Sequence, residues 1–316
     1  MPQPAQFARP ITRANMKKLL FTLLFLTFGT AWGGAFEDGK AAYERNDYAT
    51  AVKLWRPLAE QGNILTQNLM GVMYTEGLGV PQDYKEALKW LRLAAEQRFA
   101  AAQYNLGVMY SKGRGITQDD KKAVKWYRLA AAQGHAGAQY NLGMMYEKGQ
   151  GVTQDYKEAV RLYRLAAEQG DVSAQNNLGV LYRNGQGVTQ DHKEAVKWWR
   201  LAAEQGDASA QSNLGIMYSN GQGVTQDYKE AFKWRRLAAE QGVADAQYNI
   251  GLMYRKGYGV SEDYALAHMW WSLASTAGET IAIKSRDRLA QFMTPQQIEK
   301  AQEMAKACQA RNFKGC

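Results

Sequence analysis

The sequence predicts an all-α solenoid, in which helix–turn–helix repeats stack side by side. The main observation is a strict period: a Leu-Gly pair recurs at 106–107, 142–143, 178–179 and 214–215, always 36 residues apart. Such self-similarity is typical of repeat architectures. The chain also holds 30 glycines against 6 prolines in 316 residues, a balance that indicates many regular helix ends. Its composition, 46% hydrophobic and 22% charged, excludes a largely disordered chain.

Three columns of residues keep this register. Met70-Gly71 and Ile250-Gly251 extend the Leu-Gly column at both ends. The second column is aspartate, and the third is a large apolar residue that we assign to the core rather than to a ligand site. The aspartates are Asp83, Asp119, Asp155, Asp191, Asp227 and Asp263, and the apolar residues are Trp90, Trp126, Leu162, Trp198, Trp234 and Trp270.

One repeat, residues 172–206, explains the columns. Asp171 is placed to cap a first helix, and Gly185 is placed to end it in a left-handed conformation that carries no penalty for glycine. Asp191 is placed to cap a second helix, with Glu194 three residues on as the partner of a capping box. Because one hairpin cannot bury its own apolar face, we expect the hairpins to stack.

The repeats resemble the Sel-one-like repeat (SLR) family, a relative of the tetratricopeptide repeats. The resemblance is carried by residues 138–146 (AQYNLGMMY), by Gly149, Gly151 and Asp155, and by the Leu-Ala-Ala run at 165–167. It covers residues 64–279 as six repeats and implies a right-handed α/α superhelix. Residues 36–63 resemble a shorter, tetratricopeptide-like capping repeat. Arg98 stands where the other repeats have glycine, so we expect a different helix end there.

The N-terminus, residues 1–35, is predicted to be an extension followed by a cleavable signal peptide. It has no acidic residue, and Lys17-Lys18 precedes an apolar run from Leu19 to Phe28 that is too short to span a membrane comfortably. We expect cleavage between Ala35 and Phe36, with Ala31 as a rival site and Met16 as an alternative start; an uncleaved anchor helix is the alternative. The segment holds four of the 39 basic residues and none of the 30 acidic ones. The formal charge of +9 therefore falls to +5 over the remaining 281 residues.

The C-terminal segment, residues 280–316, is predicted to cap the last repeat with helices. Thr294, Pro295 and Gln297 supply the signals of a helix start, and Ile298, Ala301, Ala305 and Cys308 share one side of that helix. Cys308 and Cys316 are the only two cysteines. An exported chain meets an oxidising compartment, so we expect them to form a disulfide; two free thiols are the alternative.

Nothing in the sequence indicates catalysis, a metal or a cofactor. The Gly-x-Gly pairs lack the further residues of a phosphate-binding loop, so we assign them to turns. His135, His192 and His268 fall at unrelated offsets. Basic residues such as Lys157, Arg161 and Arg164 alternate with acidic ones, which is typical of solvated ion-pair faces and not of a nucleic-acid interface.

The first helices carry the candidate binding residues. One side of each places an apolar residue between two variable neighbours, and the resemblance implies that this side lines a concave groove suited to an extended peptide or a protein surface. The alternative is that the stripe only packs against neighbouring first helices. The candidate residues are Tyr104, Val108, Tyr140, Met144, Glu147, Asn176, Arg183, Ser212, Tyr248 and Arg255.

We therefore expect an exported, periplasmic or secreted, non-catalytic protein-interaction scaffold of bacterial type. The partner is expected to be a protein or peptide, from the envelope or a host, bound by a monomer that is not inserted in a membrane after signal cleavage. Two alternatives stay open: an enzyme that hydrolyses or binds β-lactams, although relatives of that kind carry a cysteine pair in each repeat, and an accessory protein that binds peptidoglycan.

Overall fold

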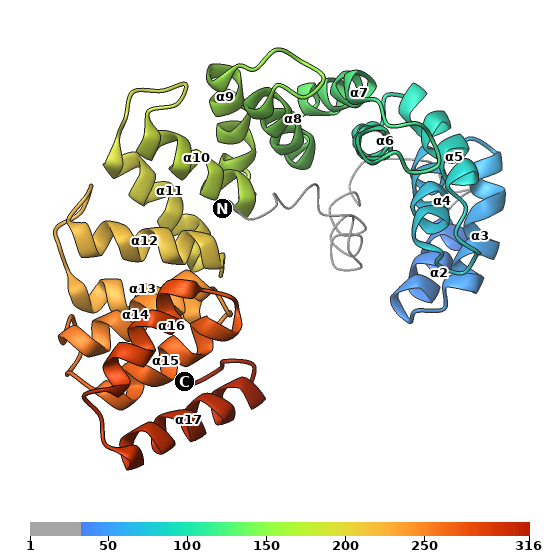
Figure 1. Ribbon diagram of the computed structural model, residues 1–316. Helices are drawn as coiled ribbons and strands as arrows, with labels where there is room; N and C mark the ends of the chain where they lie inside the picture. Colours follow the sequence, from blue (N-terminus) through green and yellow to red (C-terminus); the bar gives the residue numbers. More distant parts are fainter. Residues whose placement is uncertain (1–32) are drawn as a thin grey trace. The chain divides into compact units, whose positions relative to one another are not determined.

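The computed structural model describes residues 33–316, and within them it contains sixteen helices and no strand (Figure 1). The expected all-α fold of tandem helix–turn–helix repeats is confirmed. The first helices of the hairpins are α2 (Gly33–Glu44), α4 (Ile64–Glu76), α6 (Ala100–Lys112), α8 (Ala136–Lys148), α10 (Val172–Asn184), α12 (Ala208–Asn220) and α14 (Ala244–Lys256). The second helices are α3 (Tyr48–Glu60), α5 (Tyr84–Glu96), α7 (Asp120–Ala132), α9 (Tyr156–Glu168), α11 (His192–Glu204), α13 (Tyr228–Ala239) and α15 (Tyr264–Thr276). The last two helices are α16 (Thr280–Ala290) and α17 (Pro295–Ala310).

The chain divides into two compact units, one ending at Leu165 and the other running from Ala166 to Cys316. The boundary falls inside α9. The N-terminal unit therefore holds α2 to α8 and most of α9, and the C-terminal unit holds α10 to α17.

The helix ends form largely as expected. The Asp171 carboxylate accepts the N–H of Ala174 at 2.8 Å, and Gly185 ends α10 with φ of 67°. Asp191 accepts the N–H groups of Lys193 and Glu194 at 2.8 and 3.1 Å. The prediction of a capping box at this helix is wrong, however. The Glu194 side chain turns along α11, where the indole Nε1 of Trp198 and the ammonium of Lys197 donate to it at 3.2 Å each.

The Leu-Gly column marks where the two helices of a hairpin approach most closely. A Cβ placed on Gly179 would lie 2.6 Å from the indole Nε1 of Trp199. Because that contact is too close for any side chain, alanine is excluded there. The second helices thus carry another column of large residues against these glycines, which the sequence did not reveal: Trp55, Leu91, Tyr127, Tyr163, Trp199 and Trp271.

A buried glutamine recurs in the first helices from α4 to α14 and joins them to neighbouring helices. In the N-terminal unit, Gln103 donates to the carbonyl of Ala95 at 3.2 Å and accepts from the amide of Gln133 at 2.7 Å. The same pattern recurs in the C-terminal unit, where Gln211 donates to Ala203 and accepts from Gln241. Each glutamine therefore connects the second helix before it with the end of the second helix after it.

The prediction that the helix end at Arg98 differs from the others is wrong. Arg98 has φ of 65°, in the same left-handed region as the glycines at this position, such as Gly134 with φ of 84°. Its N–H donates to the carbonyl of Ala95 at 3.0 Å, as the N–H of Gly134 donates to Ala131. The stacked repeats therefore hold this helix end in one geometry, and Arg98 adopts a strained backbone to fit it.

Most of the predicted signal peptide lies outside the described residues. The predicted cleavage point between Ala35 and Phe36 falls in the first turn of α2. The carbonyl of Phe36 accepts the indole N–H of Trp55 at 3.2 Å, and the two rings lie 6.1 Å apart. Both contacts belong to residues that follow the cleavage point, which stays a prediction.

The C-terminal helices cover the last repeat. The capping box at the start of α17 forms as predicted, with Gln297 donating its N–H to Thr294 and accepting the N–H of Thr294 in return. Ala301, Ala305 and Cys308 are buried in apolar clusters with residues of α15. A disulfide joins Cys308 to Cys316.

Candidate protein-binding face

The candidate residues lie on one side of the first helices, which we call the first-helix face. It comprises the positions equivalent to Tyr104, Val108 and Ser111 of α6. In the N-terminal unit these are Asn68, Val72, Thr75, Tyr104, Val108, Ser111, Tyr140, Met144 and Glu147, and in the C-terminal unit they are Asn176, Val180, Arg183, Ser212, Ile216, Ser219, Tyr248, Leu252 and Arg255.

In the N-terminal unit this face is used for packing. Val108 and Met144 are only 9% and 8% exposed. The ring of Tyr104 stacks on His135 at 4.6 Å, and Glu147 accepts the hydroxyl of Tyr163. These side chains already contact residues from neighbouring helices.

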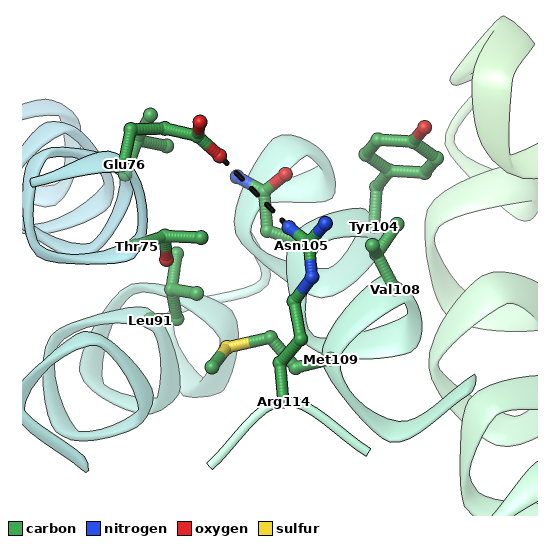
Figure 2. A pocket seen from close by; sticks show the side chains of 9 residues that line it. Thr75, Glu76, Leu91, Tyr104, Asn105, Val108, Met109 and Arg114 are labelled. Atoms are coloured by element: carbon green, nitrogen blue, oxygen red, sulfur yellow. Dashed lines mark ion pairs between the residues drawn. The ribbon is translucent and has the colours of Figure 1, made fainter. Parts of the chain in front are cut away.

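A small pocket between α4 and α6 illustrates this packing (Figure 2). Tyr104 and Val108 line it together with Thr75, and Arg114 faces Glu76 at 3.9 Å across it. Asn105, which also lines the pocket, donates to the side chain of Asn68 at 3.0 Å in a buried hydrogen bond. The pocket is a gap between two neighbouring first helices and not a long groove.

In the C-terminal unit the same face is more open. The apolar stripe of Val180, Ile216 and Leu252 is half-buried, and so are Asn176 and Tyr248. Ser212 is 8% exposed. Tyr248 stacks on Trp271 at 6.2 Å, and the indole N–H of Trp271 donates to the carbonyl of Tyr248 at 2.9 Å.

Two arginines flank this stripe with their charges unpaired. Arg183 and Arg255 are half-buried, and in the part of the chain that the structure describes neither forms an ion pair within 4.0 Å. By contrast, Arg161, on a second helix, donates to Glu158 at 2.7 Å, as expected of a solvated ion-pair face. The first-helix face of the C-terminal unit thus combines apolar surface with free positive charge.

A third arginine of the C-terminal unit is buried between the helices of a hairpin, and the sequence did not single it out. Arg235 occupies the column in which other repeats place a large aromatic or leucine residue, and its Cγ packs against Gly215. It is 8% exposed, and its Nε has no hydrogen-bond partner. Burial lowers the pKa of its guanidinium, and the charge of Asp245 raises it in part. The break in the aromatic column was the signal that could have found it.

Two arginines of second helices in the N-terminal unit have structural roles. Arg128 donates to the hydroxyl of Tyr146 at 2.6 Å, and Arg56 donates to the hydroxyl of Tyr74 at 2.7 Å. Each bond joins a second helix to the first helix of the next repeat. These residues are therefore occupied within the repeat stack.

The histidines belong to the framework. His135 accepts the N–H of Ala138 through Nδ1 and caps α8, and burial lowers its pKa to about 4. His268 is 3% exposed, and burial and the charge of Arg286 lower its pKa. Within residues 33–316 no three His, Cys, Asp or Glu side chains gather into a metal-binding group. None of the helices in this range is long and apolar enough to cross a membrane.

Two solved structures are similar to this chain in sequence. A crystal structure of a Sel1 repeat protein from Oxalobacter formigenes is 36% identical, with a TM-score of 0.67, over 76% of this chain and 96% of that one. A protective antigen present in uropathogenic Escherichia coli strains, which displays an SLR fold, is 30% identical, with a TM-score of 0.40, over 88% of this chain and 77% of that one. A search of curated proteins finds no match.

The Sel1 repeat model matches seven consecutive segments of the chain. They are residues 31–63, 65–99, 100–135, 136–171, 172–207, 208–243 and 244–279. These segments follow the hairpins of the structure one by one and cover most of its length, so the chain belongs to the Sel1 repeat family.

Proposed function

We propose that this protein is an exported, non-catalytic scaffold that binds a peptide or protein segment on the first-helix face of its C-terminal unit. The observation that carries the proposal is the half-buried stripe of Val180, Ile216 and Leu252 between the unpaired Arg183 and Arg255. Apolar surface beside free charge suits an extended peptide, since the stripe supplies contact area and the charges supply specificity.

The family supports the general part of this proposal. Sel1 repeat proteins are generally protein-interaction scaffolds. The disulfide between Cys308 and Cys316 is consistent with an oxidising compartment, as the predicted signal peptide also requires.

The test is crosslinking in cells, followed by capture of the protein and mass spectrometry. We expect the double variant Arg183→Glu/Arg255→Glu to lose its main partner while its melting temperature stays within about 2 °C of wild type, because surface substitutions change stability little. The matched control is Lys193→Glu/Lys229→Glu, which reverses two exposed charges on the second helices of the same unit.

The same partners captured by wild type and by the Arg183/Arg255 variant would contradict the proposed face. Partner loss in the control as well would assign binding to overall charge. Two further assays address the alternatives. Hydrolysis of nitrocefin by the purified protein would contradict a non-catalytic role. Cosedimentation with purified sacculi would indicate that the ligand is peptidoglycan and not a protein.

A further inference from the structure

The capping helix α16 continues the register of the first helices. Ala282 lies 36 residues after Ala246, and both are fully buried. Lys284 therefore stands at the position of Tyr248, and Arg288 stands at the position of Leu252 in the apolar stripe. The cap thus extends the first-helix face by one more helix and replaces its aromatic and apolar residues with two cations.

These two cations meet Arg255 at one pocket of the C-terminal unit. Arg255 enters from α14, Lys284 and Arg288 enter from α16, and the pocket holds about 710 Å³ of empty space that includes open solvent. The remaining lining residues are Tyr264, Trp271, Ser285, Leu289 and Phe292, so that none of the residues lining this pocket is acidic.

The three charges are not neutralised within the described chain. Residues 33–316 provide no ion pair within 4.0 Å for Arg255, Lys284 or Arg288. The neighbouring Arg286, by contrast, donates to Asp287 at 2.7 Å. Like charges that converge without a counter-ion repel each other, and an anion placed between them relieves that repulsion.

The pocket also offers apolar surface. Phe292 is 72% exposed, an unusual position for a phenylalanine, and it lies beside the buried Leu289 and Trp271. Leu252 and Tyr248 pack against the same apolar cluster, so the pocket adjoins the end of the half-buried stripe. A ligand that fits this site carries negative charge and an apolar side chain together.

We propose that this pocket binds an acidic peptide segment, with carboxylates between Arg255, Lys284 and Arg288 and an apolar side chain against Phe292. This inference rests on the proposed function, because the segment enters along the same face. A peptide is favoured over a free phosphate since phosphate has no apolar part to use the exposed ring. Arginine suits carboxylates in particular, because its guanidinium can donate two parallel hydrogen bonds.

The test is fluorescence anisotropy of the full chain with two labelled peptides. In one, glutamates flank a Leu-Phe pair, and in the other the glutamates are replaced by glutamine. We expect the acidic peptide to bind roughly tenfold or more tightly than the neutral one, with a strong dependence on salt. The variant Lys284→Glu/Arg288→Glu should bind the acidic peptide at least about tenfold more weakly than wild type. The matched variant Lys300→Glu/Lys314→Glu, whose lysines are exposed outside the pocket, should stay within about twofold.

Three results would overturn the inference. The first is equal binding of both peptides; if Leu252→Asp then abolishes that binding, the proposed function stands and only the acidic specificity fails. The second is a loss of affinity for the acidic peptide in the Lys300/Lys314 variant that equals the loss in the Lys284/Arg288 variant. The third is displacement of the acidic peptide by equimolar inorganic phosphate or by a DNA oligonucleotide. The proposed function itself is tested separately, by the crosslinking experiment with the Arg183/Arg255 variant.

Discussion

In the N-terminal unit the middle residues of the first-helix face, Val72, Val108 and Met144, are 4%, 9% and 8% exposed, whereas Val180 and Ile216 of the C-terminal unit are half-buried. The 36-residue repeats carry the same aspartate at the start of every second helix in both units. Beside the stripe, two first helices of the N-terminal unit carry tyrosine, and their first two C-terminal counterparts carry asparagine and serine. The size of the flanking residue alone does not set the exposure, since Val72 beside Asn68 is 4% exposed and Leu252 beside Tyr248 is half-buried. One repeat framework thus yields a buried stripe in one unit and a half-buried stripe in the other.

The largest effect that tests this comparison comes from one carboxylate placed in each stripe. Val108→Asp should lower the free energy of unfolding by about 3 kcal/mol, because it buries an unpaired charge, whereas Leu252→Asp should lower it by only about 1 kcal/mol. Urea unfolding followed by circular dichroism measures both. Equal losses would show that the two stripes are packed alike.

Arg235 provides the next test, since only the C-terminal unit places a charge in the column that faces the glycines. Arg235→Leu copies the arrangement of Leu91 against Gly71 in the N-terminal unit. We expect a gain of about 1–2 kcal/mol in unfolding free energy, because a buried cation with an unpartnered nitrogen gives way to an apolar side chain. A loss of stability would mean that the guanidinium makes a net favourable interaction in the folded protein.

His135 gives the N-terminal unit a pH dependence of its own. Its pKa is lowered to about 4 in the folded state, so the unfolded chain binds the additional proton as pH falls below 6.5. The contribution of the neutral histidine to stability is therefore complete above that pH. It is lost progressively between pH 6.5 and pH 4, and the loss reaches about 2 kcal/mol by pH 5.

His135→Asn keeps a side chain that can cap α8 and removes the titrating group. Thermal unfolding at pH 7 and pH 5 should show a smaller drop for this variant than for wild type. The same drop in both proteins would assign the pH dependence to other groups.

The smallest expected effect is at Arg98, in the N-terminal unit. The equivalent helix ends of the C-terminal unit have Gly206, Gly242 and Gly278, all with positive φ. Arg98→Gly should raise the free energy of unfolding by about 0.5–1 kcal/mol, because glycine adopts this backbone without strain. A melting temperature that falls instead would show that the arginine side chain compensates for its backbone.

Much of the fold could be predicted from the sequence, because its signals are local. The 36-residue period, the aspartate caps at Asp171 and Asp191 and the box at Thr294 each depend on residues within one helix or turn. The capping box predicted for Glu194 also depends on residues within one helix turn, but it does not form. The Glu194 carboxylate has three possible donors nearby, and it accepts from the indole of Trp198 and the ammonium of Lys197 instead of the backbone.

The candidate site was only partly predictable, because exposure depends on contacts between different hairpins. The register placed Tyr104 and Asn176 at equivalent positions on their helix faces, but it could not tell that His135 from the next hairpin covers Tyr104. Lys284 and Arg288 were missed for another reason. The sequence predicts only a cap for the C-terminal segment, although its first helix keeps the repeat register and contributes to the pocket.

The buried glutamines have a consequence for how the protein unfolds. Since the Gln103 amide donates to one second helix and accepts from the next, loss of either hairpin also removes a hydrogen bond of this side chain, at about 1 kcal/mol. Neighbouring repeats are then energetically coupled, as in a one-dimensional nearest-neighbour chain. Each unit should therefore melt as a cooperative block, with fraying confined to its outermost hairpins.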